Sequence, residues 1–398
     1  MRALLLENIH ADAAELLRAS GHEVETRSGA LDEAELIEAL PGVDLLGIRS
    51  TTFVTEKVLA AAPQLQAIGA FCIGTNQIDL TGATGNGVAV FNAPYSNTRS
   101  VVEVTIGAII ALARRLTEKN TAMHAGIWDK SAKGSHEVRG RTLGIVGYGN
   151  IGSQLSVLAE ALGMSVYFYD TEDRLAMGNA RRCGSLTELL ETAEVISLHV
   201  DGRPGNQNLF GEREFAAMRP RSLFMNMSRG FVVDTSALSK HIGSGHIAGA
   251  AIDVFPFEPK RQGDPFESDL RGLPNVILTP HVGGSTQEAQ QDIGRFVAGK
   301  LISYAQGGAT SLSVNLPPIG AGELSGSHRL AHMHRNVPGV LATVNALFAE
   351  HGVNVEAQNL STRADVGYLV TDVNADYTPD IIERLERMPE TIRLRVLS

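Results

Sequence analysis

The sequence contains little cysteine, and this shortage excludes two classes of protein. Its 398 residues include two cysteines, Cys72 and Cys183, which form neither a CxxC pair nor a metal-binding spacing. A secreted scaffold held by disulfides and a site built on a cysteine-bound metal are therefore not expected. We expect a reducing, cytoplasmic location and no bound metal.

Basic charge and long apolar runs are also scarce. The 34 lysines and arginines face 44 aspartates and glutamates, so the formal net charge is -10, and such a chain gains nothing from nucleic-acid phosphates. The apolar run near the N-terminus, within residues 1–7, has the length of a strand and is too short for a signal peptide or a membrane span. We expect a small-molecule substrate, and neither nucleic acid nor membrane as a partner.

The chain does contain enough apolar residues, 43% of the total, to build two or three domains with separate cores. Its first hundred residues alternate strand-length apolar runs with helix-like stretches. The strands are expected at 4–6, 43–48 and 65–70, and the helices at 11–19 and 33–39. This alternation predicts a parallel sheet covered by helices.

A second alternating series follows a long apolar helix that is expected at residues 101–116. Its strands are expected at 143–146, 165–169, 195–198, 223–226, 248–253 and 276–278. Six such segments predict a doubly wound nucleotide-binding domain. A helix expected at 287–306 would return the chain to the first domain.

The C-terminal part reads as a separate small domain behind a linker rich in glycine and proline. The expected elements are a strand at 330–335, a helix at 338–350, strands at 353–360 and 368–373, a helix at 381–388 and a strand at 392–397. The order βαββαβ is that of the ferredoxin-like fold. The predicted fold class is thus α/β, with two doubly wound parallel-sheet (Rossmann-like) domains and a ferredoxin-like domain.

A glycine-rich motif follows the first strand of the second series. Gly147, Gly149 and Gly152 form a GxGxxG pattern that opens an expected helix at 151–161. These glycines allow a tight turn, close approach of a pyrophosphate and close helix packing, and the helix N-terminus faces the phosphates. Asp170 ends the next strand, where an acidic side chain binds ribose hydroxyls and repels a 2′-phosphate, so NAD is favoured over NADP. The alternative is a structural turn with a solvated aspartate.

Three later residues supply the chemistry for hydride transfer to or from a 2-hydroxy acid. His281 follows an apolar strand and can act as general acid and base near neutral pH. Glu258 can hold the imidazole and stabilise its protonated form, and Arg229 can grip a substrate carboxylate with two hydrogen bonds. Taken singly, each has an ordinary alternative: a structural histidine, a solvated loop carboxylate and a surface salt bridge.

In this order the residues resemble the D-isomer-specific 2-hydroxy acid dehydrogenase family, up to about Val314. Five stretches carry a narrower resemblance to the branch that acts on D-3-phosphoglycerate: Gly47-Ile48-Arg49-Ser50, Phe71-Cys72-Ile73-Gly74-Thr75-Asn76-Gln77, Phe91-Asn92-Ala93-Pro94, Ser96-Asn97-Thr98-Arg99-Ser100 and Gly283-Gly284-Ser285-Thr286-Gln287-Glu288-Ala289. The resemblance implies reversible, NAD-dependent oxidation of D-3-phosphoglycerate to 3-phosphohydroxypyruvate, the first step of L-serine biosynthesis. It also implies a substrate-binding domain at 1–97 and 288–316, an NAD-binding domain at 98–287, a linker at 317–327 and a regulatory domain at 328–398.

The resemblance assigns residues to the site, with Arg229, Glu258 and His281 as the catalytic set. Cofactor contacts are implied at Gly147, Gly149, Asn150, Ile151, Gly152, Asp170, Met227, Ser228, Arg229, Asp253, His281, Gly283 and Gly284. Substrate contacts are implied at Arg49, Ser50, Ile73, Gly74, Asn97 and Lys130.

The C-terminal domain resembles the ACT domain, a small amino-acid sensor. By resemblance His334, Asn336 and Asn354 bind L-serine, a feedback inhibitor, between two paired ACT domains. Asn336 could alternatively cap a helix that begins near Pro338. Trp128 would pack on a neighbouring subunit, the alternative being an ordinary core tryptophan, and two distinct two-fold interfaces would generate a homotetramer.

The sequence departs from the family at a few positions. Ser28 and Thr51 stand where close relatives often carry basic residues, Met227 stands where a small residue is usual, and the hinge reads Gly326-Ser327. Two other functions therefore stay open. One is a related reductase of hydroxypyruvate or 2-oxoglutarate, and the other is a non-catalytic, NAD-sensing protein that resembles a corepressor.

Overall fold

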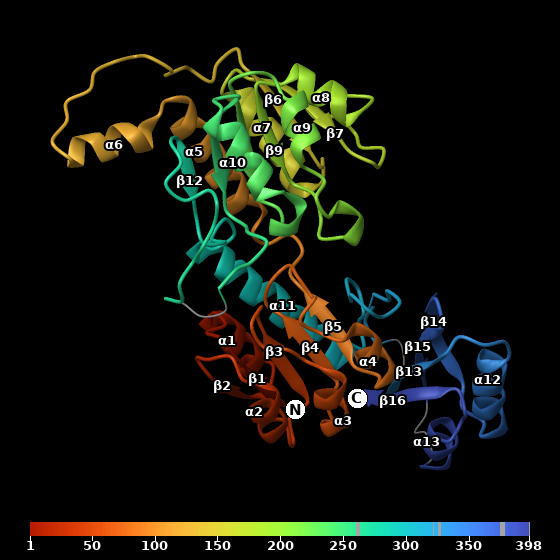
Figure 1. Cartoon of the computed structure of the whole chain (residues 1–398). Coiled ribbons are helices and arrows are strands. Elements are labelled where there is room, and N and C mark those ends of the chain that lie inside the picture. Colours follow the sequence, from red (N-terminus) through yellow and green to blue (C-terminus); the bar gives the residue numbers. More distant parts are fainter. Residues whose placement is uncertain (260–262, 321, 325–327, 375–378, 398) are drawn as a thin grey trace. The chain divides into compact units, whose positions relative to one another are not determined.

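The structure is a computed structural model that describes residues 1–259, 263–320, 322–324, 328–374 and 379–397 (Figure 1). The chain divides into a first unit, Met1–Ser96 with Gln290–Ser398, and a second unit, Asn97–Ala289. The predicted hinge at Gly326-Ser327 lies outside the described residues. None of the described helices is long and apolar enough to cross a membrane, and neither Cys72 nor Cys183 forms a disulfide.

A parallel five-stranded sheet with the order β2-β1-β3-β4-β5 opens the first unit. Its strands are β1 (Arg2–Leu5), β2 (Glu23–Thr26), β3 (Leu45–Ile48), β4 (Ala67–Ala70) and β5 (Ala89–Asn92). Its helices are α1 (Ala11–Ala19), α2 (Glu33–Ala39), α3 (Glu56–Ala61) and α4 (Leu80–Gly85). The sequence analysis identified neither β2 nor β5. Strand β2 is an edge strand that reads Glu-Val-Glu-Thr and buries none of its four residues fully, whereas β5 buries three of its four residues.

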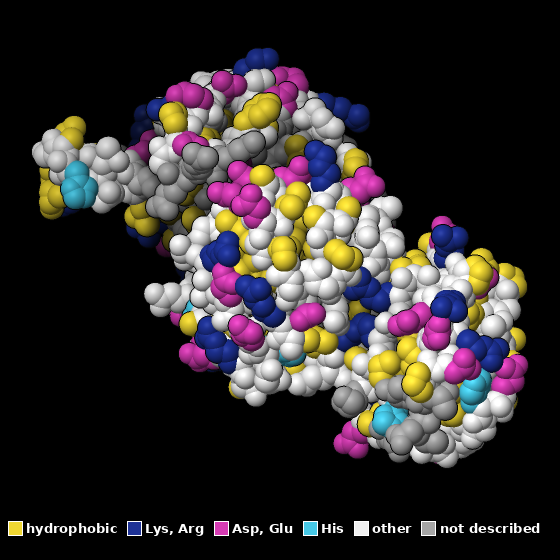
Figure 2. Space-filling view, turned by 90° about the horizontal axis from the view of Figure 1, so that it is seen from below, with side chains coloured by type: hydrophobic (Ala, Val, Ile, Leu, Met, Phe, Trp, Pro, Cys, Tyr) yellow, Lys and Arg dark blue, Asp and Glu magenta, His cyan; other side chains and the backbone are white. Residues whose placement is uncertain are grey.

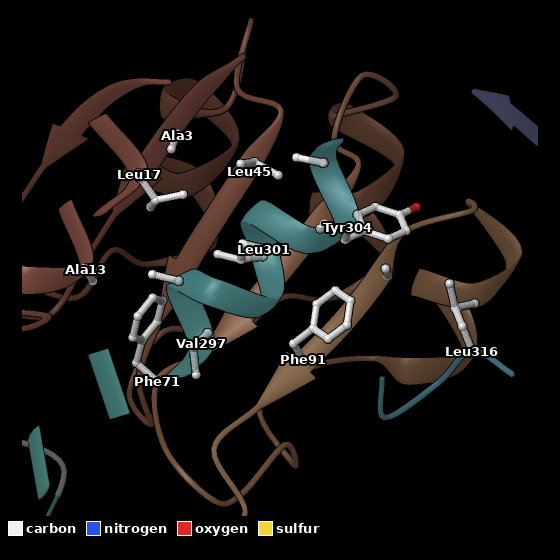
Figure 3. Packing of buried hydrophobic residues seen from close by; sticks show 14 of the residues in the cluster. Ala3, Ala13, Leu17, Leu45, Phe71, Phe91, Val297, Leu301, Tyr304 and Leu316 are labelled. Carbon is white, nitrogen blue, oxygen red and sulfur yellow. The ribbon is translucent and has the colours of Figure 1, made fainter. Parts of the chain in front are cut away.

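Helix α11 (Gln287–Gly307) packs onto this sheet and completes its core. Figure 3 shows Val297, Leu301 and Tyr304 of the helix beside Phe71 and Phe91 from the ends of β4 and β5. All five side chains are buried. The last helix of the alternating region thus belongs to the core of the first unit, as predicted.

The second unit is built on a seven-stranded parallel sheet with the order β12-β11-β10-β9-β6-β7-β8. Its strands are β6 (Thr142–Val146), β7 (Ser165–Tyr169), β8 (Arg181–Arg182), β9 (Val195–Leu198), β10 (Ser222–Asn226), β11 (Ile247–Ile252) and β12 (Val276–Leu278). Its α-helices are α5 (Thr98–Ala113), α6 (Leu116–His124), α7 (Asn150–Ala161), α8 (Leu186–Thr192), α9 (Glu212–Ala217) and α10 (Thr235–Gly243). The doubly wound prediction is confirmed, and within this sheet the apolar pattern missed the two-residue strand β8.

The long helix predicted at 101–116 is wrong at its C-terminal end. Helix α5 ends at Ala113, and Arg115 has a φ of 53°, in the left-handed region that ends a helix. A separate helix, α6, starts at Leu116 and buries none of its residues. The apolar residues Leu116 and Met123 of α6 are about half exposed. The apolar pattern of the sequence thus continues beyond Ala113, where α5 ends.

The C-terminal domain has the predicted βαββαβ order and an antiparallel sheet, β14-β15-β13-β16. Its elements are β13 (His328–Arg335), α12 (Val340–Glu350), β14 (Val355–Arg363), β15 (Val366–Val373), α13 (Pro379–Glu386) and β16 (Thr391–Leu397). The predicted start of its first helix is wrong, because Gly339, with a φ of 98°, precedes α12 and leaves Pro338 outside. Asn336 donates from Nδ2 to the Ala364 carbonyl instead of capping this helix.

This small domain packs tightly within the first unit. Met333, Tyr368 and Leu397 belong to the same buried cluster as Tyr304 of α11. The Tyr368 hydroxyl donates to the Gly308 carbonyl over 2.8 Å. On the face shown in Figure 2, acidic and basic side chains are interspersed.

Candidate active site

The glycine-rich loop has the geometry that a dinucleotide requires. Gly147 follows β6 with a φ of 90°, and a Cβ there would lie 2.6 Å from the His199 carbonyl oxygen. A Cβ on Gly152 would lie 2.3 Å from the Gly147 carbonyl oxygen. Helix α7 begins at Asn150 behind Gly149 and has no side-chain cap, so its first N–H groups remain available to an anion.

Asp170, directly after β7, is tied to this loop. Its Oδ2 accepts from the Tyr148 N–H over 2.7 Å, and its Oδ1 accepts from the Glu172 N–H over 2.9 Å. The Arg174 guanidinium lies 3.8 Å from the carboxylate, a neighbour that the sequence analysis did not consider. The loop, the open helix terminus and the fixed carboxylate together fit the pyrophosphate and ribose of a dinucleotide.

The loop after β10 positions Arg229. Asn226, fully buried, accepts from the Ser228 N–H and hydroxyl at 3.1 and 2.8 Å and donates to the Arg229 carbonyl. A Cβ on Gly230 would lie 1.9 Å from the Phe255 carbonyl oxygen, so only glycine fits there. The sequence analysis missed Asn226, because its side chain acts on the backbone of the residues that follow.

Met227 lies in the same loop and is buried in the apolar cluster around β6 and β10. The side chain therefore contributes to the core of the second unit. This packing gives the large apolar side chain of Met227 a structural role.

His281 and Glu258 form the ion pair that the sequence analysis proposed. The His281 Nδ1 lies 2.9 Å from the Glu258 Oε2, while the Phe255 N–H donates to the Glu258 Oε1 over 3.0 Å. His281 adopts a left-handed φ of 54°, and its side chain is 51% exposed. The second ring nitrogen, Nε2, has no hydrogen-bond partner in the part of the chain that the structure describes, so it is free to meet a substrate.

The surroundings shift the pKa values of both His281 and Glu258. The hydrogen bond to Glu258 raises the pKa of His281 above its ordinary value, although burial and the charge of Arg229 oppose this. Burial would raise the pKa of Glu258, yet its hydrogen bonds with His281 and Phe255 leave it below the ordinary value. The pair can therefore hold a proton on the imidazole and release it close to neutral pH.

Asp253, at the end of β11, holds the loop that carries His281. The buried carboxylate accepts from the Thr279 hydroxyl at 2.6 Å and from the Val282 and Gly283 N–H groups at 2.9 and 2.8 Å. The His281 N–H donates to the Asp253 carbonyl. Sequence reasoning assigned Asp253 to the cofactor and missed Thr279; in the structure the Asp253 side chain also sets the conformation of the loop that carries His281.

Part of the predicted substrate set lies in the first unit. Glu7 accepts from the N–H groups of Arg49, Thr51 and Thr52 at 2.9–3.0 Å and so shapes the loop that holds Arg49 and Ser50. The Ile73 carbonyl accepts from Asn92 at 2.6 Å and thereby fixes the Ile73-Gly74 segment. Glu7 was missed, although a lone acid at the end of the first apolar strand was the available signal.

The remaining predicted site residues lie in the second unit. The Asn97 Oδ1 is buried without a partner among the described residues, and a Cβ on Gly284 would lie 2.2 Å from the Asn97 Nδ2. Lys130 is exposed. Trp128 is 75% exposed, so the alternative of a core tryptophan is wrong.

The three residues predicted to bind serine do not meet within one ACT domain. His334 and Asn336 lie at the end of β13 where Arg335 pairs with Val366. Asn354 lies at the opposite end of the sheet, before Val355, which pairs with Val373. The eight residues of β13 separate these ends by about 25 Å at roughly 3.3 Å per residue.

Comparisons with known proteins agree with this geometry. Residues 106–283 match the model of the D-isomer specific 2-hydroxyacid dehydrogenase NAD binding domain, and residues 330–393 match the AHAS small subunit-like ACT domain. The solved structure of D-2-hydroxyisocaproate dehydrogenase shares 25% identity with a TM-score of 0.71 and covers 79% of this chain and 100% of its own. The D-lactate dehydrogenase of Aquifex aeolicus, solved with NAD and lactic acid, also shares 25% identity with a TM-score of 0.66, over 76% of this chain and 95% of its own.

Curated relatives match along the entire chain. D-3-phosphoglycerate dehydrogenase of Escherichia coli K12 is 50% identical, over 100% of this chain and 97% of its own. D-3-phosphoglycerate dehydrogenase 2 of Saccharomyces cerevisiae is 44% identical, over 100% of this chain and 87% of its own. The chain therefore belongs to the D-isomer specific 2-hydroxyacid dehydrogenases, which are NAD-dependent oxidoreductases, and within them to the D-3-phosphoglycerate dehydrogenases.

Proposed function

We propose that this protein oxidises D-3-phosphoglycerate to 3-phosphohydroxypyruvate, reversibly and with NAD, in the first step of L-serine biosynthesis. The observation that carries the proposal is the 2.9 Å pairing of His281 with Glu258, in a chain that matches curated D-3-phosphoglycerate dehydrogenases along its whole length. A protein that only senses NAD needs no such acid/base pair. The corepressor alternative is accordingly disfavoured.

In the proposed mechanism each side chain has a distinct task. Neutral His281 accepts the proton of the substrate C2 hydroxyl at Nε2, and Glu258 stabilises the resulting imidazolium. Arg229 holds the substrate carboxylate through its guanidinium. NAD, when bound, would accept the hydride from C2, so that the C2–H bond breaks as the carbonyl double bond forms. In the reverse direction the protonated imidazole returns the proton to the carbonyl oxygen.

The cofactor and the substrate phosphate draw on further residues. The N–H groups at the start of α7 would bind the pyrophosphate of NAD, and Asp170 would bind a ribose. We assign Arg49, Ser50 and the Ile73-Gly74 backbone to the substrate, together with Asn97 and Lys130. Asp253 acts indirectly in this proposal, since it fixes the backbone that carries His281.

Replacing His281 with alanine is the direct test of the catalytic assignment. The His281→Ala variant should lose roughly 10²- to 10⁴-fold in kcat, the range that general acid–base catalysis contributes, while NAD binding measured by calorimetry stays within twofold. Turnover retained at the parent rate would refute the assignment.

The second candidate function is that of a related reductase of hydroxypyruvate or 2-oxoglutarate, because Ser28 and Thr51 supply no charge for a substrate phosphate group. Comparing kcat/KM for 3-phosphohydroxypyruvate, hydroxypyruvate and 2-oxoglutarate separates the two functions. We expect 3-phosphohydroxypyruvate to be preferred. A higher kcat/KM for 2-oxoglutarate would move the assignment to the related reductase.

We further propose that L-serine inhibits the enzyme by binding between two ACT domains. Asn336 and Asn354 lie at opposite ends of one sheet, so a single domain cannot offer both to one small molecule. Strand β14 is an edge strand with few buried side chains, and its free edge can pair with a second copy. Unchanged rate and melting temperature in millimolar L-serine, with D-serine as the control, would contradict this proposal.

A further inference from the structure

Two loops of the first unit leave the sheet from neighbouring strands. The Arg49 loop (residues 49–52) follows β3, and the Gly74 loop (residues 71–75) follows β4. The two strands pair in parallel, with Ile48 beside Ala70 (Figure 1). Both loops therefore start at the same edge of the sheet, the carboxyl edge at which open α/β sheets bind their ligands.

Both loops carry hydrogen-bond donors without a partner in the described part of the chain. The Arg49 loop has the Arg49 guanidinium and the Ser50 hydroxyl, and the Gly74 loop has the N–H groups of Ile73, Gly74 and Thr75. All five residues are at least partly exposed. A guanidinium suits a phosphate, and successive N–H groups suit a carboxylate. The two loops together can hold the acidic groups at the two ends of one substrate.

One buried amide joins the two loops. The Gln77 Nε2 donates to the Arg49 carbonyl over 2.6 Å and to the Gly74 carbonyl over 3.3 Å. Gln77 is 3% exposed, so its side chain faces the loops from behind and leaves their free donors to the substrate. The distance between the Arg49 and Gly74 backbones thus depends on the length of a single side chain.

Further contacts hold the Arg49 loop on this link. The Glu7 Oε1 accepts from the Arg49 N–H over 3.0 Å, so the backbone of Arg49 is bound at both its N–H and its carbonyl. Behind the loops, the Val54 N–H donates to the Gln77 carbonyl over 2.9 Å. The Arg49 guanidinium therefore extends from a backbone that is fixed relative to the N–H groups of the Gly74 loop.

We propose that Gln77 is a positioning residue that sets the span between these loops and thereby selects the length of the substrate. The inference rests on the proposed function, with the phosphate at Arg49 and the carboxylate at the Ile73-Gly74 backbone. In 3-phosphohydroxypyruvate C1 is joined to phosphorus through C2, C3 and an oxygen. In 2-oxoglutarate C1 is joined to the second carboxyl carbon through C2, C3 and C4, so the spans are alike. Oxaloacetate is one carbon shorter, and 2-oxoadipate is one carbon longer.

Steady-state kinetics of the full-length protein with NADH test this length selection. Oxaloacetate, 2-oxoglutarate and 2-oxoadipate form a series of 2-oxo dicarboxylates that differ only in chain length. We expect the highest kcat/KM for 2-oxoglutarate. Equal values across the series, or a maximum at another length, would overturn the proposal.

The variant Gln77→Met tests the residue itself, because methionine has a similar length and no N–H donor. For 3-phosphohydroxypyruvate and 2-oxoglutarate, kcat/KM should fall roughly 10- to 100-fold, mainly through a higher KM, as expected for misplaced binding groups. Values across the dicarboxylate series should converge. Hydroxypyruvate has a carboxylate but no second acidic group, so its kcat/KM should fall far less. An equal loss for every substrate would indicate a merely structural role and overturn the proposal.

Two further variants separate length selection from general damage to the fold. Gln66 is a partly buried glutamine at the opposite end of β4, with its Nε2 3.5 Å from the Asp44 Oδ1, and Gln66→Met should keep the length preference of the parent. Gln77→Asn retains the amide but is one methylene shorter. It should lose the length preference as Gln77→Met does, and a preference kept in Gln77→Asn would refute the role of Gln77.

The outcomes for the parent distinguish this inference from the proposed function. A parent that prefers 2-oxoglutarate to 3-phosphohydroxypyruvate would refute the phosphorylated substrate, while the maximum at 2-oxoglutarate within the dicarboxylate series would still support length selection. A parent that reduces 3-phosphohydroxypyruvate efficiently but accepts the three dicarboxylates equally would leave the proposed function standing and refute length selection by Gln77.

Discussion

At the scale of single residues, the active site depends on the coupling between one imidazole and one carboxylate. Glu258 raises the pKa of His281, and His281 in turn helps to lower that of Glu258. Oxidation requires the neutral imidazole, so the oxidative rate should rise with pH through the raised pKa of His281, above its ordinary value near 6.5. Reduction requires the protonated imidazole, so the reductive rate should fall as the pH rises through the same range.

Replacing Glu258 with glutamine should shift this profile. Glutamine keeps the size of the side chain but removes its charge, so the pKa of His281 falls and the rise of the oxidative rate moves to lower pH. Stopped-flow measurement of the oxidative rate against pH, in Glu258→Gln and in the parent, checks the shift. A profile that stays in place would mean that Glu258 does not set the protonation of His281.

The same pair makes the stability of the fold depend on pH. Its two members lose their stabilising contributions in opposite directions of pH. The contribution of His281 is present below its unfolded pKa and is lost as pH rises through its raised folded pKa. The contribution of Glu258 is present above its unfolded pKa and is lost as pH falls through its lowered folded pKa. The pair therefore stabilises the fold most in mildly acidic solution, between the two ordinary values.

Sequence reasoning predicted a set of reactive side chains for the site and did not predict the side chains that position their loops. Arg229, Glu258 and His281 could be named because their chemistry and their places at strand ends are visible in the sequence. Asn226 and Glu7 were missed for different reasons. Asn226 bonds to backbone groups only two and three residues along the chain. Glu7 bonds to the N–H groups of residues 49, 51 and 52, and residue type alone does not reveal partners that only the fold brings together.

At the scale of elements, apolar periodicity located many of the buried strands and helices, although it did not identify the buried strand β5. Strands β7, β9 and β12 and helices α1 and α2 begin and end as predicted. The prediction failed where backbone conformation decides the boundary, at the left-handed Arg115 between α5 and α6 and at Gly339 before α12. It also failed for β2, which is a polar edge strand.

The opposite placement of Asn336 and Asn354 on the ACT sheet makes a complementation test possible. Homo-oligomers of Asn336→Ala or of Asn354→Ala should each lose at least tenfold in serine sensitivity, because every shared site then lacks one amide. Mixed oligomers of the two variants should regain part of the serine sensitivity. When two different variants pair, one of the two shared sites lacks both amides and the other site is intact. Serine inhibition of the co-expressed, tandem-purified mixture measures this. A mixture as insensitive as its parents would mean that the site lies within one domain.

Helix α6 and the segment after it suit contact with a second copy. Met123, Ile127 and Trp128 are all more than half exposed, and burying such side chains is worth roughly 1.5–3 kcal/mol each. Trp128→Ala should therefore lower the mass of the assembly measured by light scattering at micromolar concentration. Leu175→Ala, at a 90% exposed leucine elsewhere in the second unit, should leave the mass unchanged. Equal masses for Trp128→Ala and the parent would contradict the proposed contact.

At the scale of the whole molecule, the first unit combines two domains of different fold. Tyr368 of the ACT domain is buried against α11 and donates to the Gly308 carbonyl. Arg395 lies over the Tyr304 ring, 4.2 Å from its centroid, and donates to the Tyr304 and Ala305 carbonyls. The ACT domain is thus attached through side-chain packing as well as through the chain.

Tyr368→Ala should destabilise the first unit as a whole. Truncating a buried aromatic side chain costs about 3–5 kcal/mol, and here the cavity would open beside Tyr304 and Met333. Scanning calorimetry should show one of the melting steps moving to lower temperature, while the step of the second unit stays within a degree or two. A shift confined to a small separate step would contradict shared packing.

The cluster that joins the ACT sheet to α11 also bears on how the protein could be shortened or recombined. Removing residues 328–398 would uncover Tyr304, Leu301 and Ile319, and an apolar face of this kind promotes aggregation in a soluble chain. Grafting a different sensor in its place would require a replacement that presents a matching apolar surface. The ACT domain of this protein is in that sense not an interchangeable module, because its sequence is also constrained by the packing against α11.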